Sequence, residues 1–176
     1  GPLADDRRNL IGNWSAAGDW KKAVSLLSGV REALGESAAK ARILHARGAN
    51  LLADKKLIDF LNKHGGDIKI DKRPAEEMIK EAVAVAKKAD VVVVALGESQ
   101  GMSGEAAPRT RLQLPANQQA LLRALYQVGK PLVLVLFNGG SGVRVEAAPG
   151  ADGDAARCLQ EAAARLRGQT GERGVS

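Results

Sequence analysis

The stretch "DVVVVALGESQGMSGEAAPRTRLQLP", residues 90–115, joins an apolar run to a long polar segment. Residues 91–96 are all apolar and do not alternate with polar residues. Runs of this kind are typical of strands covered on both faces, as in parallel sheets. We therefore predict a buried strand over 90–96. The segment 97–115 that follows is longer than most connections in compact domains, which favours a functional loop.

The segments around this strand complete an α/β pattern. Apolar residues three to four positions apart predict amphipathic helices, as with Val24, Leu27, Val30 and Leu34 in the first of them. The predicted helices are 19–35, 54–66, 74–89 and 116–130, and the further predicted strands are 41–49 and 131–139. A strand, a helix and a second strand in this order form a parallel crossover. The expected fold class is α/β, with a mostly parallel sheet sandwiched by helices. Residues 1–5, "GPLAD", are interpreted as the end of a further strand whose beginning is missing.

Composition narrows the class of protein. The chain has 176 residues, 45% of them hydrophobic and 26% charged, which is typical of one globular domain with its own core. The net charge is +6, but basic and acidic residues are interleaved and aromatics make up only 3%, too few for a platform that stacks nucleic-acid bases. No apolar run has the length of a membrane helix, and no signal peptide is recognisable. One cysteine and two histidines give no metal-ligand cluster, and we expect no cofactor.

The composition changes near Gly139. Residues 139–176 contain five arginines but no lysine and no aromatic residue, and they are rich in Ala and Gly. We therefore divide the chain into a domain over 1–139 and an atypical tail over 140–176. The tail is predicted to form a weakly packed helix or to be disordered.

The loop 97–115 carries the residues best suited to chemistry. Ligands of parallel α/β sheets bind beyond the carboxyl ends of the strands, which is where this loop begins. Its glycines lack the spacing of a phosphate-binding motif. A glutamate with a raised pKa can act as a general acid, and an arginine nearby can bind substrate. Glu98 and Glu105, with Arg109, are the candidates, although both acids are equally compatible with a solvated loop.

Several separated motifs resemble the C-terminal α/β sandwich domain of family-3 glycoside hydrolases, and within that family bacterial periplasmic β-glucosidases. They are "GPLADDRRNLIGNWSAAG", "RGANLLADKKLIDFLNK", the long segment from "PAEEMIKEA" to "QALLRAL", and "GKPLVLVLFNG". The resemblance covers residues 1–139 almost continuously. It implies a retaining β-glucosidase that cleaves terminal β-D-glucosyl residues in the periplasm. In such enzymes an N-terminal barrel supplies the aspartate nucleophile, and this domain supplies the acid/base loop.

The resemblance also implies roles for individual residues. The acid/base glutamate of the family corresponds to Glu105 and, as second candidate, to Glu98, with Arg109 beside the substrate. Trp14 matches a position that stacks on the sugar in some relatives, and it is equally compatible with a packing role. Arg111 departs from the family, which has an aspartate there.

Two further departures leave the function open. No residue of the chain can be assigned as the nucleophile, so the isolated chain is expected to be inactive without its barrel. After residue 139 the family pattern stops, and we hypothesise a frameshift near codon 140. Resequencing the locus tests this, because an intact frame through Ser176 with no family-like alternative would contradict it. The alternatives to an enzyme fragment are a carbohydrate-binding module without catalysis and a non-functional truncated product.

Overall fold

The computed structural model describes residues 1–10, 18–34, 42–102 and 113–138. The elements in these residues are η1 (Trp20–Lys22), α1 (Leu26–Leu34), α2 (Lys55–Lys63), α3 (Ala75–Lys87), β1 (Val92–Gly97), η3 (Gln100–Met102), α4 (Ala116–Tyr126) and β2 (Leu132–Phe137). None of these helices is long and apolar enough to cross a membrane.

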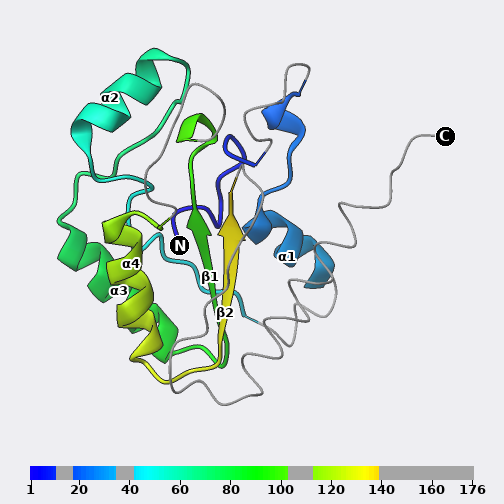
Figure 1. Ribbon diagram of the computed structural model, residues 1–176. Coiled ribbons are helices and arrows are strands. Elements are labelled where there is room, and N and C mark those ends of the chain that lie inside the picture. Colours follow the sequence, from blue (N-terminus) through cyan, green and yellow to red (C-terminus); the bar gives the residue numbers. More distant parts are fainter. Residues whose placement is uncertain (11–17, 35–41, 103–112, 139–176) are drawn as a thin grey trace.

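The two strands confirm the predicted parallel crossover. β1 and β2 pair in parallel, in register from Val92 opposite Leu132 to Gly97 opposite Phe137. α4 lies between them in sequence and forms the crossover (Figure 1). Both strands therefore end at the same edge of the sheet. The α/β class predicted from the sequence is confirmed, with a two-stranded sheet in the described residues.

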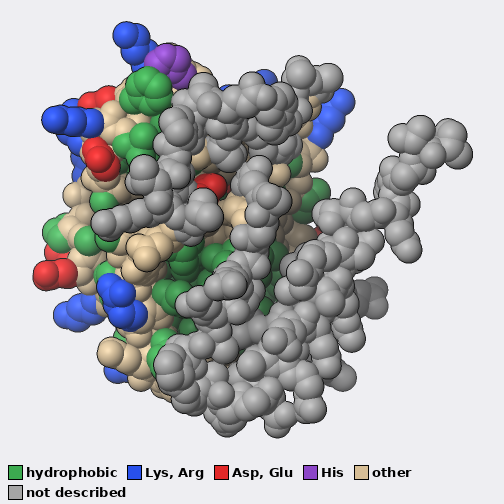
Figure 2. Space-filling view, viewed as in Figure 1, with side chains coloured by type: hydrophobic (Ala, Val, Ile, Leu, Met, Phe, Trp, Pro, Cys, Tyr) green, Lys and Arg blue, Asp and Glu red, His purple; other side chains and the backbone are tan. Residues whose placement is uncertain are grey.

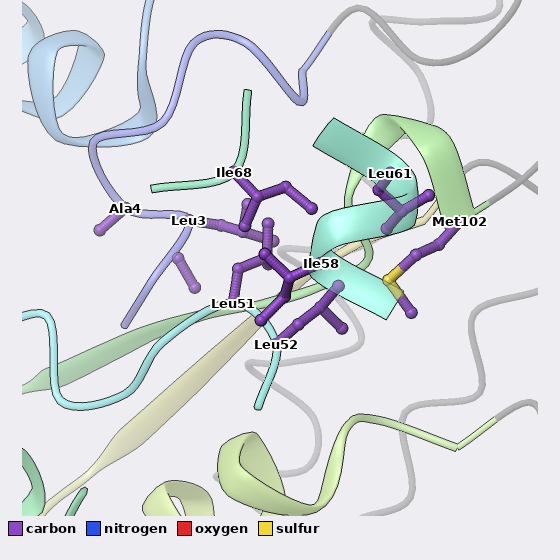
Figure 3. Close-up of a cluster of buried hydrophobic side chains, with 9 residues drawn as sticks. Leu3, Ala4, Leu51, Leu52, Ile58, Leu61, Ile68 and Met102 are labelled. Atoms are coloured by element: carbon purple, nitrogen blue, oxygen red, sulfur yellow. The ribbon is translucent and has the colours of Figure 1, made fainter. Parts of the chain in front are cut away.

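Two hydrophobic clusters hold the elements together. On one face, Val92, Val94 and Leu96 of β1 pack with buried residues of α3 and α4, such as Ala82 and Leu121. The other cluster gathers Ala95 of β1 with α2, the chain start and η3. Figure 3 shows its side chains, which are Leu3, Ala4, Leu51, Leu52, Ile58, Leu61, Ile68 and Met102. Because this cluster lies near the carboxyl end of β1, it supports the edge where the loop begins.

The helices at 54–66, 74–89 and 116–130 are confirmed, but the helix predicted over 19–35 begins late. Asp19 caps the short turn η1, and Ala23 is extended, with φ −67° and ψ 141°. The Ser25 hydroxyl then accepts a hydrogen bond from the Ser28 amide at 3.1 Å, which is how an N-cap serine starts a helix. Val24 and Val30 are 58% and 39% exposed, so the predicted apolar stripe is buried only in part.

The predicted strand over 41–49 is not formed in its described residues, 42–49. The Ala46 carbonyl accepts a hydrogen bond from the Gly1 nitrogen at 3.0 Å, which is a single contact and not a repeated ladder. Gly48 has φ 71° and lies against Leu121, so the chain turns here where a strand would continue.

The expectation that residues 90–96 are covered on both faces is wrong for their first half. Val91 and Val93 are 53% and 48% exposed. β2 is a strand as predicted, but all six of its residues are only half-buried. Figure 2 shows hydrophobic side chains at the surface in the centre of the view, where Figure 1 places the sheet. The helices therefore leave part of the sheet uncovered by described residues.

Candidate functional site

The carboxyl ends of β1 and β2 form the edge that the sequence predicts for the site. Of the candidate residues, Glu98 is described and lies directly after β1, half-buried. Its backbone amide donates to the Phe137 carbonyl at 2.9 Å, so the loop starts beside the end of β2. Trp14, Glu105 and Arg109 lie outside the described residues. The structure therefore places one of the two candidate acids, Glu98. It also describes the residues that come directly before the segments with Trp14, Glu105 and Arg109.

Gly97 is required at the point where β1 becomes the loop. Its φ is 146°, which L side chains rarely adopt. A Cβ atom here would lie 1.9 Å from the Phe137 carbonyl oxygen. The two strands thus approach each other closely at their carboxyl ends, and Glu98 leaves the sheet in a direction set by this glycine.

Gln118 of α4 fixes the same edge, and the sequence analysis did not identify it. Its side chain is fully buried. Its amide oxygen accepts from the Gly97 N–H at 2.8 Å, and its amide nitrogen donates to the carbonyls of Gly97 at 2.8 Å and Leu51 at 2.7 Å. All three partners are backbone groups that would otherwise be buried without hydrogen bonds. The sequence contains a signal for this role, because Gln118 is a polar residue on the apolar stripe of the helix. It lies three positions before Leu121 and seven before Leu125.

The first part of the loop is anchored in the core. Met102, at the end of η3, is 6% exposed and packs in the cluster of Figure 3 beside Leu61 of α2. Gly101 passes so close to this helix that a Cβ atom would lie 2.9 Å from the Leu61 side chain. The segment that contains Glu105, three residues further along the chain, therefore starts from a fixed point.

A hydrogen bond joins this loop to the segment that precedes Trp14. The Asn9 side-chain oxygen accepts from the Gln100 amide at 2.7 Å. Asp6 holds Asn9 in turn, accepting from its backbone amide at 3.0 Å and from its side-chain amide at 2.7 Å. Two segments 91 residues apart, each leading into a candidate site residue, thus share one edge of the sheet.

A cavity of about 370 Å³, lined mostly by polar and charged residues, borders the same N-terminal segment. Arg8 lies over the Trp20 ring at 5.7 Å, within the range of a cation–π contact, and donates to the Gly65 carbonyl at 2.8 Å. The Arg47 side chain donates a hydrogen bond to the Lys69 carbonyl at 2.7 Å. In the described part of the chain, no three His, Cys, Asp or Glu residues are grouped as a metal site would need.

Comparison with known families identifies the family of this chain. The sequence model described as "Glycosyl hydrolase family 3 C-terminal domain" matches residues 1–172. The chain belongs to this family. The resemblance seen in the sequence motifs is thereby confirmed.

Curated relatives agree with this family. The chain is 51% identical over 139 residues to the periplasmic beta-glucosidase of Salmonella typhimurium, covering 79% of this chain and 18% of that protein. It is 30% identical over 143 residues to a beta-xylosidase of Formosa agariphila, covering 79% of this chain and 17% of that protein. The chain thus spans less than a fifth of the length of either relative.

Solved structures give the same relationship. A beta-glucosidase involved in saponin metabolism from intestinal bacteria superposes with a TM-score of 0.57 at 28% identity, covering 77% of this chain and 20% of that one. The beta-glucosidase of Listeria innocua in complex with gluconolactone superposes with a TM-score of 0.55 at 26% identity, covering 78% and 15%. This domain is one part of much larger chains in both cases.

Proposed function

We propose that this domain supplies the acid/base loop of a retaining β-glucosidase whose nucleophile lies on a separate barrel domain. The observation that carries the proposal is the shared edge joined by the Asn9–Gln100 hydrogen bond. It supports a site built from two segments, the loop with Glu105 and the segment with Trp14. The 51% identity to a protein named periplasmic beta-glucosidase supports the substrate class and a periplasmic location.

Each candidate residue has a role in this proposal. Glu105 protonates the glycosidic oxygen as the aglycone leaves, and then removes a proton from the water that hydrolyses the glycosyl-enzyme intermediate. A nucleophile roughly 5–5.5 Å away, on the barrel, forms that intermediate. Arg109 contacts the substrate, and the indole of Trp14 stacks on a sugar ring. Glu98, half-buried directly after β1, is the second candidate for the acid/base.

Kinetics of the longer protein with its barrel test the assignment. Glu105→Gln is expected to lower kcat/KM for a β-glucoside with a poor leaving group by about 100-fold or more, since general acid catalysis contributes factors of this size. A dinitrophenyl β-glucoside needs no proton on its leaving group, so its glycosylation step is expected to lose far less. Added azide, a nucleophile that needs no base, is expected to restore turnover and to give β-glucosyl azide.

Glu98→Gln is the matched control, because it neutralises the other loop carboxylate. Azide rescue in Glu98→Gln and its absence in Glu105→Gln would move the acid/base role to Glu98. No selective effect of leaving group or azide in either variant would contradict the proposal as a whole. The isolated 176-residue chain is expected to show no hydrolysis of an aryl β-glucoside, and activity there that depended on Glu105 would show that the barrel is not required.

Paired substrates test the substrate class. Because one relative is named a beta-xylosidase, the longer protein is compared on β-glucosides and β-xylosides that share one aglycone. We expect the ratio of kcat/KM values to favour the glucoside. A ratio that favours the xyloside would retain the acid/base proposal and replace its substrate.

A further inference from the structure

The side chain of Asn9 forms a directed bridge from the N-terminal segment to the loop after β1. Its oxygen accepts from the Gln100 amide at 2.7 Å, and its nitrogen donates to the Asp6 carboxylate at 2.7 Å. A backbone amide can only donate and a carboxylate can only accept, so the Asn9 side chain satisfies both neighbours in one orientation alone. Asp6 therefore fixes which atom of Asn9 faces the loop.

Both ends of this bridge rest on the same hydrophobic cluster. Leu3 is fully buried three residues before Asp6, and Met102 is buried two residues after Gln100 (Figure 3). Asp6 also accepts from the Asn9 backbone amide at 3.0 Å, which closes the turn between these two residues. Asn9 is therefore placed from the core side, and not only through its contact with the loop.

The loop residue that Asn9 holds lies between two other hydrogen-bonded points. Before Gln100, the Glu98 amide donates to the Phe137 carbonyl at 2.9 Å. After it, the Met102 amide donates to a carbonyl of its own turn, η3, at 3.0 Å. The first bond ties the loop to the sheet and the second shapes the turn. The bond to Asn9 ties the same residues to the N-terminal segment.

We propose that Asn9 is a positioning residue for the acid/base loop, acting through the Gln100 amide and held by Asp6. The inference rests on the proposed function, but it applies whichever of Glu98 and Glu105 is the acid/base, because both lie within five residues of Gln100. A general acid must come within hydrogen-bond reach of the oxygen that it protonates. A displacement of about 1 Å costs up to roughly 100-fold in rate, so loss of the bridge slows the proton-dependent step selectively.

Kinetics of the longer protein with its barrel test the role of Asn9. Asn9→Ala is expected to lower kcat/KM about 10-fold for a β-glucoside with a poor leaving group, and less than about 3-fold for a dinitrophenyl β-glucoside. A loss of folded protein alone would lower both values by the same factor.

Asn62→Ala is the matched control. The Asn62 side chain also bridges a donor and an acceptor of the backbone, the N–H of Ile68 at 2.6 Å and its carbonyl at 3.1 Å, but in the turn after α2. This variant is expected to change kcat/KM for the two substrates by the same factor.

An exchange of the two side chains tests the direction of the bridge. Asn9→Asp places a second carboxylate against that of Asp6, and Asp6→Asn turns two amide NH₂ groups toward each other. Each single variant is expected to show the selective loss of Asn9→Ala. The double variant, with Asp6→Asn and Asn9→Asp together, again sets a donor opposite an acceptor and still offers an oxygen to Gln100. It is expected to recover about half or more of the parent kcat/KM on the poor leaving group.

Equal losses on both substrates in Asn9→Ala would overturn the inference, and so would a double variant that recovers nothing. A selective effect of Glu105→Gln or Glu98→Gln in the same assays would then leave the proposed function standing. If no variant of the loop or of Asn9 depends on the leaving group, the inference and the proposed function both fail.

Discussion

At its carboxyl end β1 is held from several sides, whereas at its amino end alternate side chains face solvent. Gly97 is fixed by Gln118 and by close contact with Phe137. Val91 and Val93 are about half exposed beside an apolar groove. The end at which we propose the catalytic site is held by contacts between described residues. The described residues give the amino end no comparable support.

The largest expected effect is at Gly97. Gly97→Ala introduces a Cβ atom 1.9 Å from a backbone carbonyl that cannot move without breaking the strand pairing. We expect a loss of more than about 4 kcal/mol in the free energy of unfolding, or failure to fold, measured by urea denaturation. Gly65→Ala is the control, because Gly65 also has a positive φ, 87°, but open space around it. Its expected loss is about 1 kcal/mol, and equal losses at both sites would contradict the close approach of the strands.

Gln118→Ala is expected to have the next largest effect. It leaves three buried backbone groups without their partner, and each such group costs about 1–3 kcal/mol. Allowing for relaxation, we expect a loss of about 3 kcal/mol in urea denaturation. Gln127→Ala, at an exposed site after the same helix, is expected to change stability by less than about 0.5 kcal/mol. A neutral Gln118→Ala would mean that the carboxyl edge is not held by this side chain.

A pair of truncations compares the two ends directly. Met102→Ala empties a buried site and is expected to cost about 2 kcal/mol, whereas Val93→Ala at a half-exposed site costs under about 1 kcal/mol. Urea denaturation of the two variants measures both costs. Equal losses at Met102 and Val93 would contradict the difference in burial between the two ends of β1.

The smallest expected effect is at Asp71, which lies at neither end of β1. The Arg73 side chain donates to this carboxylate, and with the Arg73 backbone amide it lowers the pKa of Asp71 to about 2 from 3.8. Stability from this pair is therefore present above about pH 4 and is lost as the pH falls towards about 2. Arg73→Ala is expected to return the pKa of Asp71 towards 3.8 in an NMR titration of the carboxyl carbon. Glu81→Gln, which leaves the four hydrogen bonds from Arg73 to Asp71 in place, is expected not to do so.

Periodicity predicted most of the fold because the elements concerned bury their own apolar stripes. α3 buries Met78, Ala82 and Ala86, which are four positions apart and so lie on one face of the helix. The pattern failed where enclosure depends on other segments. The run 91–96 is apolar enough to be covered on both faces, yet Val91 and Val93 are half exposed because the described chain provides nothing to cover them.

The sequence predicted the edge from which the loop leaves but not the residues that support this edge. The loop was expected to begin at the carboxyl end of a buried parallel strand, and Glu98 lies directly after β1. Gln118 escaped notice because a glutamine on an apolar helix face shows its role only when its backbone partners at Gly97 and Leu51 are known. The roles of Glu105, Trp14 and Arg109 stay predictions from the family resemblance, since their positions lie outside the described residues.

The hydrogen bond between Asn9 and Gln100 also bears on the order in which contacts form during synthesis and folding. Its partners are separated by 91 residues, and Leu3 packs in the same cluster as Ala95 and Met102. At a synthesis rate of about 5–20 residues per second, the N-terminal segment waits roughly 5–20 s for these partners. During that time its apolar residues are available to chaperones or to wrong partners. The contact that joins the two candidate segments is therefore expected to be among the last that the domain acquires.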